Sequence, residues 1–175
     1  MMYEFYRHGS RYPAYTSIVG TGENSCVLHY NDNNMQIKDG DLVLIDAGCE
    51  YENYASDITR TFPASGRFTA EQKAIYEIVL RAQQAAIAAI KPGMGWDVPQ
   101  EICARIITEG LVDVGILQGN VDDLIAQKKY FQFYMHRSGH WLGLDVHDAG
   151  SYAVNGNLRN VQPGMVFTVE PGIYI

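Results

Sequence analysis

The stretch from residue 42 to residue 62, LVLIDAGCEYENYASDITRTF, constrains the fold more than any other part of the chain. Residues 42–49 and 54–62 are rich in β-branched, apolar and aromatic residues, and only a short polar segment separates them. Two such runs joined by a few polar residues predict a β-hairpin. Each run also carries an acidic residue near one end, and a carboxylate at the edge of an apolar strand needs a positive partner.

The two acids, Asp46 and Asp57, are predicted to meet on one face of this hairpin. With a two-residue loop at Tyr51-Glu52, they would lie directly opposite each other, with Cβ atoms about 5 Å apart. Two like charges at that distance either raise one pKa or require a cation. Carboxylates arranged in this way can share divalent ions, although a solvated acid at a strand end remains the alternative.

A second cluster lies near the end of the chain. Residues 136–148 read HRSGHWLGLDVHD and contain three of the five histidines, and Glu170 follows an apolar run at TVEPG. A neutral imidazole binds divalent metals and also acts as an acid or base near neutral pH. The set Asp46, Asp57, His140 and Glu170 offers mainly oxygen donors, which suit Mn²⁺, Mg²⁺, Fe²⁺ or Zn²⁺.

Composition excludes several classes of protein. The 175 residues are 47% hydrophobic and 19% charged, as expected for one globular domain rather than a disordered chain. The net charge of −7 argues against nucleic acid as a partner, because phosphate binding needs a basic face. No apolar run is long enough to span a membrane, and the N-terminus lacks an apolar signal core. Three cysteines without a CxxC pair predict reduced thiols in a cytoplasmic protein.

The order of elements predicts an α+β fold, with helices packed on one face of an antiparallel sheet. Strands come first and return last, and helices lie between them. The expected elements are two short strands within 16–30, helices over 69–90 and 97–115, a short helix over 122–129, and strands from 134 to the end.

Four local strings carry a family resemblance: IVGTGENSCVLHY, DGDLVLIDAGCEYENYASDITRTFP, HWLGLDVHD and PGMVFTVEPGIYI. They resemble the pita-bread metallopeptidases, and within that group bacterial Xaa-Pro aminopeptidase (aminopeptidase P). The order Asp46, Asp57, His140, Glu170 is similar to the order of the metal ligands in these enzymes. The resemblance covers nearly the whole chain and implies one catalytic domain over 1–175, without the family's N-terminal domain.

This resemblance implies a metalloexopeptidase that hydrolyses the bond between an N-terminal residue and a following proline. The implied cofactor is a pair of divalent ions, usually manganese, with Asp46, Asp57, His140 and Glu170 as ligands. A hydroxide activated by the two ions would attack the scissile carbonyl, and Glu170 would also transfer protons. The implied partner is a peptide with an Xaa-Pro N-terminus, and a homo-oligomer is compatible with the family.

Three further histidines match pocket positions of the family. The resemblance implies that His29, His136 and His147 bind the substrate, with His136 and His147 also catalytic. His29 has an alternative as a core histidine at the end of a strand. Tyr152 and Tyr174 also match positions near the pocket, although aromatic residues at strand ends more often pack in cores.

The chain departs from the family pattern in two ways that bear on function. A further bridging glutamate of the family would lie beyond Ile175, so this fold is expected to be incomplete at its C-terminus. The residues between His136 and His140 are Arg-Ser-Gly, and an arginine there could change substrate choice. Two alternatives therefore remain: a prolidase-type Xaa-Pro dipeptidase, and a catalytically impaired peptide-binding domain of the same fold.

Overall fold

The structure, a computed structural model, describes all residues from 1 to 175 and divides into two compact units. The first, which we call the strand unit, comprises residues 1–69 and 141–149. The second, the helical unit, comprises residues 70–140 and 150–175.

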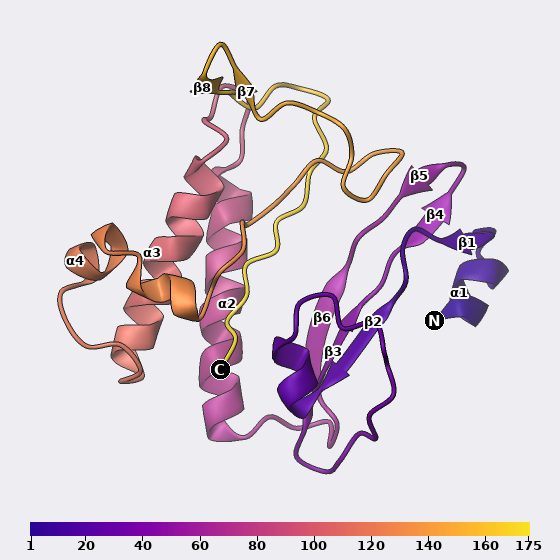
Figure 1. Cartoon of the computed structure of the whole chain (residues 1–175), viewed down its shortest axis with the longest axis horizontal. Helices are drawn as coiled ribbons and strands as arrows, with labels where there is room; N and C mark the ends of the chain where they lie inside the picture. The colour runs from indigo at the N-terminus through magenta and orange to yellow at the C-terminus, as the bar shows by residue number, and fades with distance from the viewer. The chain divides into compact units, whose positions relative to one another are not determined.

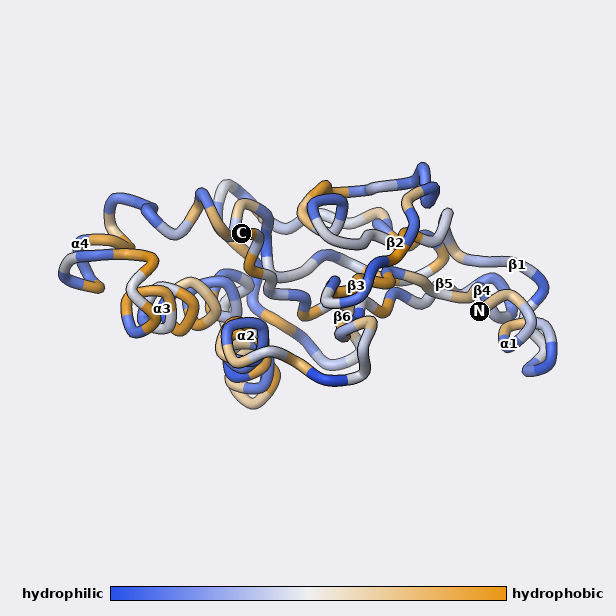
Figure 2. Tube along the Cα trace, turned by 90° about the horizontal axis from the view of Figure 1, so that it is seen from below, coloured by the Kyte–Doolittle hydropathy of each residue, from blue (hydrophilic) through white to orange (hydrophobic).

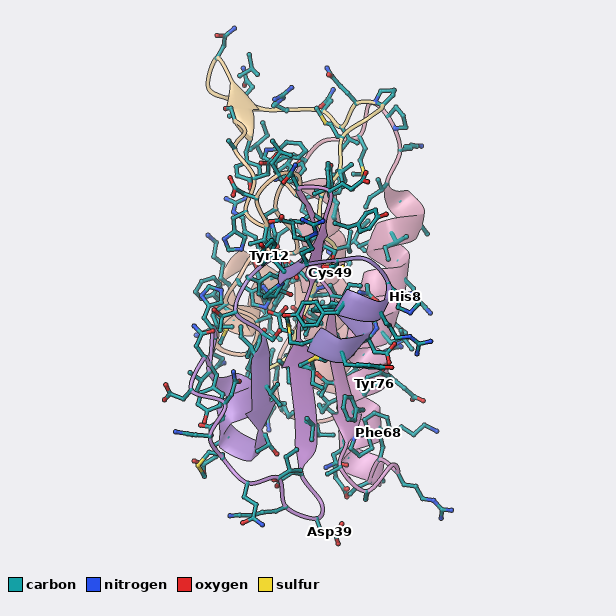
Figure 3. The ribbon with its side chains drawn as sticks, turned by 90° about the vertical axis from the view of Figure 1, so that its right-hand side faces the viewer. His8, Tyr12, Asp39, Cys49, Phe68 and Tyr76 are labelled. Carbon is teal, nitrogen blue, oxygen red and sulfur yellow. The ribbon has the colours of Figure 1, made fainter.

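The strand unit contains two three-stranded antiparallel sheets, one with the order β2-β3-β6 and one with the order β1-β4-β5 (Figure 1). The central strand β3 begins with four apolar residues and ends at Asp46. Asp39 lies at the tip of the loop that precedes β3 (Figure 3). The elements of this unit are α1 (Met2–Arg7), β1 (Tyr12–Pro13), β2 (Ile18–Thr21), the 3₁₀ helix η1 (Gly22–Cys26), β3 (Leu42–Asp46), β4 (Cys49–Tyr51), β5 (Tyr54–Ala55) and β6 (Thr59–Pro63).

The predicted hairpin is present, but the predicted register is wrong by two residues. Asp46 pairs with Thr59 rather than with Asp57. The two-residue turn lies at Glu52 and Asn53, which both adopt positive φ angles of 50° and 67°. Asn tolerates this conformation better than most residues, which favours a type I′ turn at this place. Because side chains alternate with a period of two, a shift of two residues leaves both acids on the same face.

The segment 16–30 contains one strand rather than the two that we predict. After β2 the chain enters the 3₁₀ helix η1, and no strand follows it up to residue 30. The hydroxyl of Ser25 donates a hydrogen bond of 2.6 Å to the carbonyl of Gly22. Short polar side chains that bond to the nearby backbone in this way compete with strand formation.

The helical unit confirms the three predicted helices. Helices α2 and α3 pack against each other, and Figure 2 shows hydrophobic and hydrophilic residues alternating around them. Their apolar faces bury side chains such as Ile78, Ile107 and Leu111 in one core. None of the helices is long and apolar enough to cross a membrane. The elements of this unit are α2 (Ala70–Ala89), α3 (Val98–Asp113), α4 (Val121–Ala126), the 3₁₀ helix η2 (Lys129–Gln132), β7 (Ala153–Val154) and β8 (Asn157–Leu158).

The strands that we predict from residue 134 onwards are mostly absent, because only the short hairpin β7–β8 forms there. The segments 138–140 and 168–170 are nevertheless joined by backbone hydrogen bonds. The N–H of Thr168 donates to the carbonyl of His140 at 3.0 Å, and the N–H of Glu170 donates to that of Ser138 at 2.7 Å. Antiparallel pairs with a contiguous block of helices confirm the α+β class.

Candidate metal centre

The two hairpin acids meet at a tyrosine within the strand unit. The hydroxyl of Tyr15, which lies between β1 and β2, donates a short hydrogen bond to Oδ1 of Asp46 and lies 3.1 Å from Oδ1 of Asp57. Both carboxylates are half-buried. One hydroxyl can reach both acids only if they project from the same face, so the pairing of Asp46 and Asp57 is present despite the changed register.

Tyr15 is a site residue that the sequence does not reveal. Burial and, next, the hydrogen bond to Asp46 raise the pKa of Tyr15 far above its usual range. The phenol therefore stays neutral near pH 7 and acts as a hydrogen-bond donor to the acids. The chain has 12 tyrosines, and nothing in the local sequence RYPAYTS distinguishes this one.

Close backbone approach brings the two arms of the hairpin together beside these acids. An added Cβ on Gly48 would overlap with the carbonyl oxygen of Ser56, so only glycine fits at this position. On either side, the N–H of Ala47 donates to Ile58 at 3.1 Å and the N–H of Ser56 donates to Cys49 at 3.0 Å. Gly48 thus allows the arm that carries Asp57 to approach the end of β3.

The second predicted pair of ligands lies in the helical unit. Nε2 of His140 lies 3.2 Å from Oε1 of Glu170. Thr168 orients both residues, because its hydroxyl donates to Oε1 of Glu170 at 2.8 Å and accepts the backbone N–H of His140 at 3.0 Å. Hydrogen bonds that orient ligands in this way are typical of metal sites in proteins.

A second glycine makes the contact between His140 and Glu170 possible. A Cβ on Gly139 would overlap with the carbonyl oxygen of Thr168. We expect Gly139→Ala to push the two segments apart and to lower the free energy of unfolding by about 1–3 kcal/mol, as overpacking does elsewhere. Chemical denaturation of the metal-free protein measures this change. Unchanged stability would show that the segment moves without cost.

His136 is fixed by two contacts. Its Nδ1 lies 2.9 Å from the carbonyl oxygen of Arg137, and its Nε2 lies 2.9 Å from the hydroxyl of Tyr174. Since a carbonyl only accepts, we assign the proton to Nδ1, so that Nε2 of the neutral ring accepts from Tyr174. Tyr174 is therefore a partner of a predicted site residue rather than only a core residue.

His29 and His147 lie together in the strand unit, with ring centroids 6.3 Å apart. Both are exposed, and His29 adopts a φ of 56° outside any strand. The alternative interpretation of His29 as a core histidine at the end of a strand is therefore wrong. Exposed imidazoles side by side can contact a substrate and exchange protons with it.

Each unit contributes two of the predicted ligands, and the donor chemistry fits a divalent ion. Three carboxylates and one imidazole form a set that suits hard or borderline cations. The 3.2 Å between His140 and Glu170 is compatible with two ligands of one ion, since such bonds are about 2.0–2.2 Å long. No group of three or more His, Cys, Asp or Glu side chains in position to hold an ion is present, and each unit by itself shows one pair.

Comparison with known protein families identifies the family of the chain. The sequence model of metallopeptidase family M24 matches residues 1–175. The chain belongs to this family. Membership implies divalent metal ions, which the two donor pairs fit.

Individual M24 relatives match the chain closely. Xaa-Pro aminopeptidase of Haemophilus influenzae is 57% identical over 175 residues, which are 100% of this chain and 40% of the relative. Human Xaa-Pro dipeptidase is 46% identical over 188 aligned residues, covering 98% of this chain and 38% of the relative. The chain thus spans about 40% of the length of these curated relatives.

A solved structure confirms the predicted fold. The structure of Pseudomonas aeruginosa aminopeptidase PepP superposes with a TM-score of 0.97 at 61% identity, covering 99% of this chain and 39% of that one. This M24 chain accordingly has the pita-bread fold that the sequence resemblance implies.

Proposed function

We propose that this M24 chain is part of a metal-dependent aminopeptidase that hydrolyses the bond between an N-terminal residue and a following proline. The observation that carries the proposal is that the four predicted ligands lie in pairs whose side chains are held by hydrogen bonds. Four residues at the positions of the motif form two pairs, and each pair is oriented by a hydroxyl, from Tyr15 or Thr168. The 57% identity to an Xaa-Pro aminopeptidase, against 46% to an Xaa-Pro dipeptidase, favours the aminopeptidase.

The proposed ligands are Asp46, Asp57, His140 and Glu170, and the proposed cofactor is two Mn²⁺ ions. Bound divalent ions would contribute to peptide hydrolysis in two ways. They polarise the scissile carbonyl, and they lower the pKa of water so that hydroxide is available near neutral pH. Like-charged carboxylates such as Asp46 and Asp57, which share one donor hydroxyl, are stabilised when a cation binds them.

Glu170 has a second role in the proposed mechanism. Its Oε1 accepts the Thr168 hydroxyl and lies against His140, which leaves Oε2 to take up a proton and deliver it to the leaving amine. His136 would line the substrate pocket with its ring held in place by the hydroxyl of Tyr174, and His29 and His147 would bind the substrate through their exposed rings. A hydrogen bond from His147 to the developing oxyanion would stabilise the transition state.

Product analysis tests the proposed specificity. The protein is incubated with Mn²⁺ and either Ala-Pro or Ala-Pro-Ala, and the released amino acids are separated by chromatography. We expect alanine and Pro-Ala from the tripeptide and slower cleavage of the dipeptide. Cleavage of the dipeptide alone would identify an Xaa-Pro dipeptidase instead, and cleavage of neither would favour a peptide-binding domain.

His147→Ala separates catalysis from metal binding. We expect kcat to fall by about 10²–10³-fold, as after loss of other donors to an oxyanion, with Mn²⁺ affinity unchanged. Steady-state kinetics and calorimetric titration measure the two quantities. His8→Ala, at another exposed histidine of the strand unit, is the matched control and should change neither. Loss of Mn²⁺ binding in His147→Ala would contradict the role proposed here.

We also propose that the protein works in the cytoplasm. Its three cysteines, Cys26, Cys49 and Cys103, form no disulfide, which supports a reducing compartment.

A further inference from the structure

Ser138 lies between the two histidines of the helical unit and is 4% exposed. Its backbone N–H donates to Oε1 of Gln100 at 2.7 Å, and its hydroxyl donates to the same oxygen at 3.0 Å. Its carbonyl accepts the N–H of Glu170 at 2.7 Å. Every polar group of this residue is therefore engaged, two of them by one glutamine side chain.

Tyr134 completes this arrangement from within the core. It is fully buried, its hydroxyl forms a short hydrogen bond with that of Ser138, and burial raises its pKa well above the usual range. The phenol stays neutral and shares a hydrogen bond with the Ser138 hydroxyl, which donates to Gln100. The Tyr134 hydroxyl also lies 3.3 Å from the same oxygen of Gln100, so this one oxygen on α3 accepts from both residues, and no member is charged.

Gln100 lies on a packed helix, from which it can fix the position of Ser138. It lies in the first turn of α3, and that helix packs against α2 over the buried core. The residues it holds are adjacent to the predicted site: Ser138 follows His136 by two residues and precedes His140 by two. A shift of Ser138 would move the carbonyl that binds the N–H of Glu170, and hence the pair His140–Glu170.

We propose that Gln100 is a positioning residue, which sets the separation of His140 and Glu170 through Ser138 and thereby the affinity of that pair for a divalent ion. The inference rests on the proposed function for the metal, but the placement of His140 by Gln100 does not. Partners that orient ligands change metal affinity by about 10–100-fold when they are removed.

The first experiment needs no metal. In the histidine side-chain ¹H–¹³C spectrum of the metal-free protein, Gln100→Leu should shift the ring signals of His136 and His140. It should leave those of His8, His29 and His147 in place. Unchanged signals of His140 in a folded Gln100→Leu protein would overturn the proposal.

The second experiment is a titration with Co²⁺, whose visible absorption reports on coordination. We expect Gln100→Leu to bind Co²⁺ about 10–100-fold more weakly, with an altered spectrum. Gln100→Glu keeps an acceptor oxygen for both donors of Ser138 and should restore wild-type binding. Gln84→Leu, at an exposed glutamine of α2, is the matched control and should bind as the wild type does.

The outcomes separate the two proposals. If the wild type binds no Co²⁺ but Gln100→Leu shifts the His140 signals, the metalloenzyme function fails and the positioning role stands. If the wild type binds Co²⁺ and Gln100→Leu binds it equally well, the positioning role is wrong. Should Gln100→Leu not fold, Ser138→Ala tests the same link, because it removes only the hydroxyl and should give a smaller shift in the same signals.

Discussion

Asp57→Ala is expected to weaken Mn²⁺ binding by about 100-fold or more and to abolish peptide cleavage with it. The change removes a proposed ligand, and its effect should exceed the 10–100-fold that follows loss of an orienting partner. It also leaves the Tyr15 hydroxyl with Asp46 as its remaining acceptor of the pair. Isothermal titration calorimetry with Mn²⁺ measures the affinity and the number of ions bound.

Asp39→Asn is the matched control for this change. Asp39 is an exposed acid at the tip of the loop before β3 (Figure 3), and it is not one of the proposed ligands. The substitution Asp39→Asn lowers the negative charge of the chain by the same amount as Asp57→Ala. It therefore tests whether Mn²⁺ binding depends on net charge alone. Equal loss of binding in both variants, or full binding in Asp57→Ala, would contradict the assignment of Asp57.

His140→Ala should lower metal affinity and turnover together. The substitution removes the imidazole that lies 3.2 Å from Glu170 and leaves that carboxylate with the hydroxyl of Thr168. We expect affinity for Mn²⁺ to fall by about 100-fold and turnover at fixed Mn²⁺ to fall in proportion. Titration calorimetry and kinetics over a range of Mn²⁺ concentrations measure both.

Raising the Mn²⁺ concentration distinguishes a ligand from a residue that acts on the substrate. If His140 is a ligand, excess Mn²⁺ should recover part of the turnover in His140→Ala. In His147→Ala, excess Mn²⁺ should recover none. Normal affinity combined with slow turnover in His140→Ala would move this residue from the metal to the substrate.

Much of the fold follows from local sequence. The helices α2 and α3 are predictable because apolar residues recur at helical spacing and Pro92-Gly93 separates the two runs. The register of the hairpin is not, because either of two polar pairs could form its turn. Asn53 favours the observed turn because Asn tolerates a positive φ. In the sequence, this preference is a weaker signal than the spacing of hydrophobic residues.

The strands expected after residue 134 could not be predicted correctly for a different reason. Their β-branched residues predict regular pairing, yet the chain there forms one short hairpin and otherwise only scattered backbone hydrogen bonds, such as that from Thr168 to His140. Strand preference depends on what lies alongside the chain, so composition alone does not fix it.

The candidate site also has a part that the sequence predicts and a part that it does not. Acidic and histidine residues at motif spacing are visible in the sequence, and the structure shows Asp46 with Asp57 and His140 with Glu170. The residues that orient them are Tyr15, Thr168 and Gln100, which are common types in ordinary contexts. Only the folded backbone brings their polar atoms to the ligands, so no pattern in the chain could have singled them out.

Anomalous diffraction at the manganese absorption edge, from crystals of the Mn²⁺-loaded protein, tests the central assignment most directly. We expect Mn²⁺ peaks whose ligands include Asp46, Asp57, His140 and Glu170. Peaks that none of these four side chains coordinates, or crystals soaked in Mn²⁺ that show no peak at all, would contradict it.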